Sequence, residues 1–178
     1  MNVVSVKNDA LILVGNYQFA DKVKSEVLSL LKVCNTIPQN NSNVKASIHT
    51  EWDWEPDNIT FRNLKSFIRE EIERHFQPGS MSGGGRPRLM CKNFWANVYE
   101  KGDYAEPHDH KSHNYSFAYF VKSKWYDSPL IFTDSRKRIR PKEGKFVIFP
   151  AYLYHHVPKH RFNDTRITLS GNLVLNRE

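Results

Sequence analysis

The chain has 178 residues, of which 39% are hydrophobic and 25% are charged, a composition typical of one globular domain. It excludes a disordered chain, and the longest apolar run, Ala10 to Val14, is far shorter than the roughly 20 residues that span a bilayer. The formal net charge of +7 comes from basic residues that are mostly scattered, so we expect it to serve solubility.

Neither the cysteines nor the start of the chain indicates secretion. Cys34 and Cys91 have no CxxC spacing, which excludes a disulfide framework and a thiolate metal site and suits a reducing compartment. The sequence does not open on a cationic leader followed by an apolar stretch. We therefore expect a cytoplasmic protein without a membrane segment.

The first half predicts a strand and two amphipathic helices. Residues 9–15 form a short apolar run that ends at a glycine, which is typical of a buried strand. Apolar residues then recur at helical spacing from Phe19 to Leu31, with Asn16 as the expected N-cap, and again from Phe61 to Phe76. Residues 34–43 predict a loop, and Gln77 to Pro87, which contains three consecutive glycines, predicts a flexible connection.

The second half predicts short strands separated by turn residues. These segments are rich in aromatic and β-branched residues and cover residues 88–99, 115–122, 128–133, 145–149 and 165–175. Helices followed by strands predict the α+β class, with a single domain over residues 1–178 that divides into a helical support region (1–80) and a barrel or jelly-roll core (88–175). The basic run from Arg136 to Lys142 is expected to be a solvated loop.

Histidines concentrate in this second half, where six of the eight lie between positions 108 and 160. In an extended segment, residues i and i+2 project to the same face, so His108 and His110 should point together and Asp109 should point away. The pair His155-His156, which follows the apolar run 146–149, is the expected source of a third ligand. Three histidines with open coordination positions would form a metal site of the catalytic type.

The segment from Thr165 to Asn172 offers an anion-binding face. Strand alternation places Ile167 and Leu169 on one side and Arg166, Thr168 and Ser170 on the other. A guanidinium beside hydroxyl groups matches a carboxylate, which it can hold through two parallel hydrogen bonds.

These three segments together resemble a known family. The stretch Trp95 to Tyr104 followed by His108-Asp109-His110 resembles the first iron motif of the 2-oxoglutarate/Fe(II)-dependent oxygenases, in particular a subgroup common in marine bacteria and phages. Phe149 to Val157 is similar to the second motif of that subgroup, and Arg166-Ile167-Thr168 is similar to its arginine motif. The resemblance covers roughly residues 88 to 172.

The resemblance implies a double-stranded β-helix (jelly roll) with N-terminal helices packed on one sheet. Iron would be held by His108, His110 and His155, and the co-substrate 2-oxoglutarate would be bound by Arg166, Thr168, Tyr99 and Asn97. The implied activity is a dioxygenase that uses Fe(II), O2 and 2-oxoglutarate, is stimulated by ascorbate, releases succinate and CO2, and hydroxylates a protein side chain or a small molecule.

Several alternatives stay open at this point. Most of the superfamily has HxD where this chain has His108-Asp109-His110, so Asp109 could replace His110 as a ligand if the backbone is not extended there. His156 should face away from His155, and His113 and His160 should lie in loops near the mouth of the site.

A three-histidine site would also suit a zinc hydrolase or lyase, and a jelly roll can be a binding module without chemistry. A nucleic-acid substrate ranks lower, because no aromatic-basic motif accompanies the charge.

Overall fold

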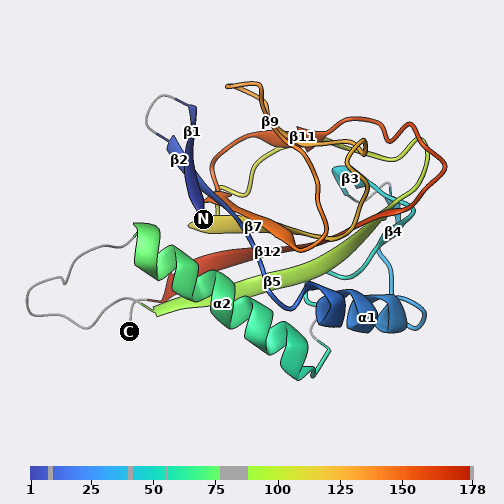
Figure 1. Ribbon diagram of the computed structural model, residues 1–178, viewed down its shortest axis with the longest axis horizontal. Helices are drawn as coiled ribbons and strands as arrows, with labels where there is room; N and C mark the ends of the chain where they lie inside the picture. The colour runs from blue at the N-terminus through green and yellow to red at the C-terminus, as the bar shows by residue number, and fades with distance from the viewer. Residues whose placement is uncertain (8–9, 40–41, 55, 77–87, 177–178) are drawn as a thin grey trace, which may run out of the picture.

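The computed structural model describes residues 1–178 except 8–9, 40–41, 55, 77–87 and 177–178. Two sheets lie one above the other, and the two helices cover the outer face of the larger sheet (Figure 1). The larger sheet has, in spatial order, β1 (Asn2–Lys7), β2 (Ala10–Asn16), β10 (Lys145–Pro150), β7 (Tyr115–Lys122), β12 (Arg166–Asn176), β5 (Arg88–Tyr99) and β4 (Ile48–His49). The smaller sheet has β3 (Val44–Lys45), β6 (Tyr104–His108), β11 (His155–Val157), β8 (Leu130–Phe132) and β9 (Lys137–Ile139).

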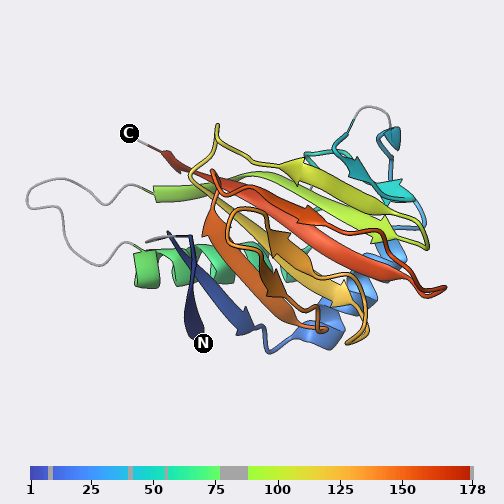
Figure 2. The same cartoon turned by 90° about the horizontal axis from the view of Figure 1, so that it is seen from above.

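Neighbouring strands within both sheets run antiparallel, which confirms the predicted jelly roll with helices on one sheet. The two longest strands, β5 and β12, pair along nearly their whole length and run side by side through the centre of the molecule (Figure 2). They carry the predicted co-substrate residues, so the longest strand pair of the fold positions that part of the site.

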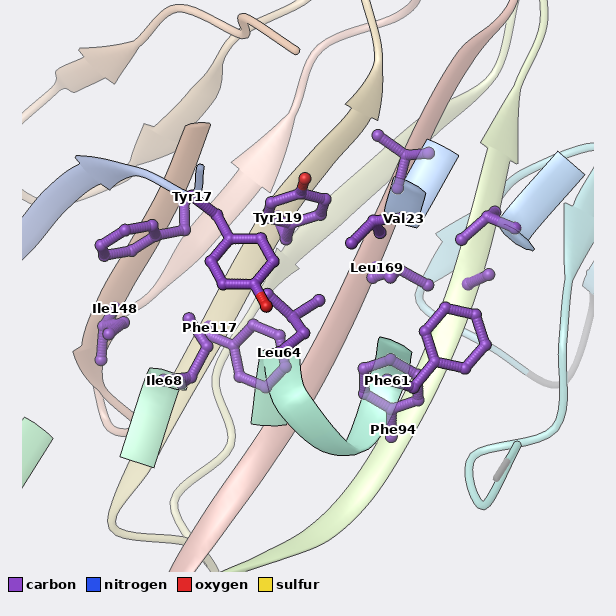
Figure 3. Close-up of a cluster of buried hydrophobic side chains, with 14 of the residues drawn as sticks. Tyr17, Val23, Phe61, Leu64, Ile68, Phe94, Phe117, Tyr119, Ile148 and Leu169 are labelled. Carbon is purple, nitrogen blue, oxygen red and sulfur yellow. The ribbon is translucent and has the colours of Figure 1, made fainter. Parts of the chain in front are cut away.

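The helices are α1 (Ala20–Leu30) and α2 (Ile59–Phe76), close to the predicted limits. Their apolar stripes pack on the larger sheet, where Leu64 and Ile68 of α2 lie against Phe117 of β7 (Figure 3). The expected cap at Asn16 is wrong, because β2 continues to Asn16, which pairs with Lys145; α1 begins after Phe19 without a side-chain cap. In contrast, Asn58 caps α2 by accepting a hydrogen bond from the Thr60 amide at 2.7 Å.

A second apolar cluster fills the space between the two sheets. It combines side chains of the larger sheet, such as Phe120 and Val147, with side chains of the smaller one, such as Phe132 and Val157. The period-two pattern of β10 explains both clusters, since Phe146 and Ile148 face the helices while Val147 and Phe149 face the smaller sheet.

The structure differs from the sequence prediction in several segments. Residues 1–80 are not only helical, because β1, β2 and β4 join the larger sheet and β3 joins the smaller. The basic run 136–142 is not wholly a loop: residues 137–139 form β9, an edge strand, although the side chains of Lys137 and Arg138 are exposed as expected. The predicted connection from Gln77 to Pro87 lies outside the described residues. Within the part of the chain that the structure describes, neither helix is long and apolar enough to cross a membrane.

Gly171 allows β12 to pack closely between its neighbours. A Cβ atom at this position would lie 2.5 Å from Cε1 of Phe117 and 2.8 Å from the carbonyl oxygen of Asn93. Because one of these neighbours is backbone, Gly171→Ala should lower the free energy of unfolding by about 1–3 kcal/mol. Chemical denaturation measures this loss, which comes from the close contacts because φ of Gly171 is not in the positive range. Gly102→Ala, at φ of +97° and without a neighbour within 4 Å, measures the separate cost of backbone strain.

Candidate active site

Three histidines from two parts of the chain meet at one end of the space between the sheets. His108 ends β6 and His155 begins β11, and the two residues pair directly across these strands. His110 follows β6, where its backbone amide donates a 2.8 Å hydrogen bond to the carbonyl of Ala151. One ring nitrogen of each histidine lies within 4.8 Å of those of the other two. This spacing allows all three to contact one metal ion.

Backbone carbonyls orient two of the three rings. Nδ1 of His108 lies 2.6 Å from the carbonyl oxygen of Glu106, and Nδ1 of His155 lies 2.9 Å from that of Leu153. A carbonyl can only accept, so each Nδ1 carries the proton and each Nε2 keeps its lone pair free. This is the arrangement that fixes metal-binding histidines in proteins.

The electrostatic surroundings keep the three imidazoles neutral. Burial, reinforced by the neighbouring histidines, lowers the pKa of His110 to about 3 and that of His155 well below its ordinary value of 6.5. Burial also lowers the pKa of His108. Neutral imidazoles are metal ligands, whereas imidazolium ions are not.

The remaining candidates near this cluster point elsewhere. The Asp109 carboxylate lies 2.9 Å from Nζ of Lys111, and Nδ1 of His156 lies 3.1 Å from the Thr133 hydroxyl. His113 is near the surface, with its Nδ1 3.0 Å from the Ser112 hydroxyl. His160 does lie on a loop, but its side chain is buried and bonded to Asp164.

Arg166 at the start of β12 is buried, and no carboxylate among the described residues forms an ion pair with it. The residue is 1% exposed, and its guanidinium carbon lies 4.7 Å from the centre of the Tyr99 ring and 5.4 Å from that of Phe120. Among the described residues, Nε and Nη1 have no hydrogen-bond partner. Burial lowers the pKa of Arg166, while Tyr99 and Asp127 oppose that effect. A buried guanidinium with free donors is costly to a fold unless an anion fills the space beside it.

One pocket connects the histidines to this guanidinium. It lies between the two sheets, and its polar lining includes every residue predicted to bind metal or co-substrate: Asn97, Tyr99, His108, His110, His155, Arg166 and Thr168. The predicted alternation of β12 is confirmed, since Arg166, Thr168 and Ser170 line this pocket whereas Ile167 and Leu169 pack under the helices.

Strand register shows that the histidines and the guanidinium lie at opposite ends of the pocket. Arg166 pairs with Tyr99, whereas Ser170, about 13 Å further along β12, pairs with Trp95. The Trp95 ring lies 5.9 Å from that of His110, so the histidines are at the Ser170 end and the guanidinium is at the other. Such a pocket can hold a dicarboxylate with one end at a metal ion and the other at Arg166.

Sequence reasoning missed two aromatic residues at this site. Phe120 covers the guanidinium, and Trp95 backs His110, but both are aromatic residues in strands, which are usually core residues. Strand register could have identified both residues, because each lies in a strand adjacent to β12 and pairs with a residue of its polar face: Trp95 with Ser170 and Phe120 with Thr168.

The lowered histidine pKa values predict a pH dependence of stability in metal-free protein. Unfolded histidines titrate near 6.5, so below this pH the unfolded state binds protons that the folded site does not accept. The free energy of unfolding should therefore be highest above pH 6.5, where the histidines are neutral in both states, and should decrease as the pH falls from 6.5 toward 3.

Urea unfolding at pH 7.5 and pH 5.0 in the presence of a chelator measures this loss. We expect a smaller loss in His110→Gln, which cannot titrate, than in the wild type. Equal pH dependence of the two proteins would contradict neutral, buried imidazoles at this site.

The fold and the pocket define a class of protein: a jelly roll whose interior offers a histidine cluster and a buried arginine for a metal ion and a dicarboxylate. Comparison with known proteins leads to the same class. A family model described as "Putative 2OG-Fe(II) oxygenase" matches residues 133–172, a segment that contains His155 and Arg166. No curated protein sequence matches the chain.

Solved structures share the fold over nearly the whole chain. A viral collagen prolyl hydroxylase of Paramecium Bursaria Chlorella virus-1, in complex with 2OG, has a TM-score of 0.66 at 12% identity and covers 91% of this chain and 94% of its own. A prolyl-4-hydroxylase of Pseudomonas putida has a TM-score of 0.66 at 12% identity, with 93% of both chains covered. A Trichoplax adhaerens prolyl hydroxylase, in complex with a hypoxia inducible factor peptide fragment, has a TM-score of 0.67 at 13% identity and covers 92% of this chain and 83% of its own.

The resemblance to the 2-oxoglutarate/Fe(II)-dependent oxygenase superfamily is thereby confirmed. The family match supports an enzyme of this type, with Fe(II), 2-oxoglutarate and O2 as the cofactor and co-substrates that the family implies, and the solved structures share the fold of this chain.

Proposed function

We propose that the chain is one dioxygenase domain that hydroxylates a peptide side chain or a small molecule and converts 2-oxoglutarate to succinate and CO2. The observation that carries the proposal is a buried guanidinium with free donors in the same pocket as three neutral imidazoles, two of them oriented by backbone carbonyls. Neither feature alone selects this chemistry, but the two together match a metal-chelating dicarboxylate.

In this proposal, His108, His110 and His155 hold Fe(II), which together with 2-oxoglutarate supplies the oxidising chemistry. Three imidazoles leave the site one unit more positive than two imidazoles and a carboxylate would, a difference that alters its metal affinity. Asp109 is not a ligand in this proposal, because its carboxylate faces Lys111.

Arg166 would bind the distal carboxylate of 2-oxoglutarate, with the Thr168 hydroxyl as a second donor on the same face of β12. Tyr99 and Asn97 occupy the paired positions on β5 and would contact the co-substrate from the same face of the larger sheet. Apolar side chains of the smaller sheet, including Leu130 and Val157, complete the wall and exclude water from the charged contacts.

A second, open space of about 910 Å³ reaches the same histidines from outside and provides a place for the primary substrate. It is lined by β3 and the end of β6, with Trp52, Glu106 and Asp109 beside His108 and His110. Its openness to solvent suits a peptide or a polar small molecule, and the neighbour from Trichoplax adhaerens binds a peptide.

The proposal is tested by supplying Fe(II), ascorbate, O2 and 2-oxoglutarate to the full chain and measuring succinate, with and without a peptide array or a metabolite mixture. We expect succinate to form in the wild type and in His156→Ala but not in His155→Ala. Iron-loaded protein that forms no succinate with any array member, but gains hydrolytic activity with Zn²⁺, would favour the zinc enzyme instead.

A further inference from the structure

We propose a second divalent-cation site, separate from the first, formed by Asp127, His160 and Asp164. Asp127 lies on the loop between β7 and β8, and the other two residues lie on the loop between β11 and β12. One ligand atom of each side chain lies within 4.8 Å of those of the other two. The sequence does not suggest this cluster, because Asp127 is far from its partners along the chain.

Each of the three side chains is anchored through one polar atom and leaves the other free. Oδ2 of Asp127 accepts a 2.7 Å hydrogen bond from the Lys124 amide, and Oδ2 of Asp164 accepts one of 2.8 Å from the Tyr126 hydroxyl. Nε2 of His160 lies 2.8 Å from the carbonyl oxygen of Asp164. The orientation of each side chain is therefore fixed before any ion binds.

The remaining polar atom of each side chain is a hydrogen-bond acceptor without a donor. Because a carbonyl only accepts, Nε2 of His160 carries the proton and Nδ1 has an unprotonated lone pair. Within the described part of the chain, this Nδ1 and the Oδ1 atoms of Asp127 and Asp164 are buried and have no hydrogen-bond partner. Oδ1 of Asp164 comes within 3.4 Å of Nε2 of His160, beyond a good hydrogen bond. These three buried acceptors without a partner belong to side chains whose ligand atoms lie within 4.8 Å of one another, so a cation between the side chains would satisfy them.

The donor set defines the kind of cation. Two carboxylate oxygens and one imidazole nitrogen suit Zn²⁺ or another divalent first-row metal, whereas Ca²⁺ needs six to eight oxygen ligands. Asp127 and His160 are each 1% exposed, but the Asp164 side chain is 27% exposed, which gives an ion a route from solvent.

An ion at this site would fasten together the two loops that flank the guanidinium end of the pocket. The Ser128 hydroxyl already joins them through a 3.1 Å hydrogen bond to the Lys159 carbonyl. Asp164 lies two residues before Arg166, and the charge of Asp127 acts on the Arg166 guanidinium. The proposed ion is therefore structural and holds the start of β12 in place.

The test is the number of Zn²⁺ ions retained per chain after dialysis, measured by atomic emission. Wild-type protein should retain two ions, and His155→Ala and Asp164→Asn should each retain one. The double variant His155→Ala/Asp164→Asn should retain none. Asp57→Asn removes the same charge from a side chain that is 88% exposed and should leave the count at two.

Thermal unfolding separates loss of the site from loss of the fold. Added Zn²⁺ should raise the melting temperature of His155→Ala but not that of the double variant, while near-ultraviolet circular dichroism shows both to be folded. Asp127→Asn in the His155→Ala background should also abolish the shift. A His155→Ala protein that retains no Zn²⁺, or one whose count and melting shift are unchanged by Asp164→Asn, would overturn the second site. Neither result bears on the oxygenase proposal, because the first site is removed throughout.

Discussion

Arg166→Met should raise the KM for 2-oxoglutarate at least about 10-fold while metal binding stays intact, a loss of about 1.4 kcal/mol of binding free energy. The guanidinium is the buried donor group at the far end of the pocket, and methionine fills similar space without charge or hydrogen bonds. A carboxylate left unpaired beside Tyr99 and Phe120 would be poorly solvated. Steady-state kinetics with varied 2-oxoglutarate measure the change.

Two controls make the Arg166 result specific. Arg166→Lys keeps the charge but loses the planar fork, so its KM should fall between those of the wild type and the methionine variant. The melting temperature of Arg166→Met without co-substrate should equal or exceed that of the wild type, because the substitution removes a buried charge that forms no ion pair with a carboxylate of the described residues. An unchanged KM in a folded methionine variant would remove Arg166 from the co-substrate site.

His155→Ala should lose one Fe²⁺ per chain relative to the wild type, with affinity at the histidine cluster reduced more than about 100-fold. Loss of a residue that merely orients a ligand already costs about 10- to 100-fold, and His155 is proposed to be a ligand itself. Equilibrium dialysis under anaerobic conditions, followed by iron analysis, measures the stoichiometry.

The neighbouring residue provides the matched control for this loss. His156→Ala should bind as much iron as the wild type, because its ring points to Thr133. Since His155 also packs against Phe149, with ring centres 4.8 Å apart, His155→Gln tests for loss of the ligand with less loss of volume. Full iron binding by both His155 variants would remove His155 from the metal site, and loss of iron in His156→Ala alone would exchange the two assignments.

The sequence predicts the long elements of this fold well and the short ones poorly. Strands β5, β7 and β10 and helix α2 have enough residues to display a period of two or of 3.6, and their predicted limits nearly coincide with the observed ones. Strands β3, β4, β9 and β11 have only two or three residues each, too few for any period. Their pairing is decided by the strands beside them, which is a tertiary effect.

The same distinction holds for the candidate site. Local alternation was enough to place His108 beside His110, and Arg166 beside Thr168. Bringing these pairs into one pocket needs the pairing of β6 with β11 and of β12 with β5, which the sequence suggests only through family resemblance. The cluster of Asp127, His160 and Asp164 had no such guide, and His160 was expected to be an ordinary loop residue.

The central claim is that one pocket binds a metal ion and 2-oxoglutarate together, and calorimetry of 2-oxoglutarate binding to Fe(II)-loaded protein under anaerobic conditions tests it most directly. We expect one 2-oxoglutarate to bind per chain, with binding lost in His155→Ala and weakened at least about 10-fold in Arg166→Met. Protein that binds Fe(II) at the histidine cluster but shows no heat of binding for 2-oxoglutarate at any concentration up to millimolar would contradict the account.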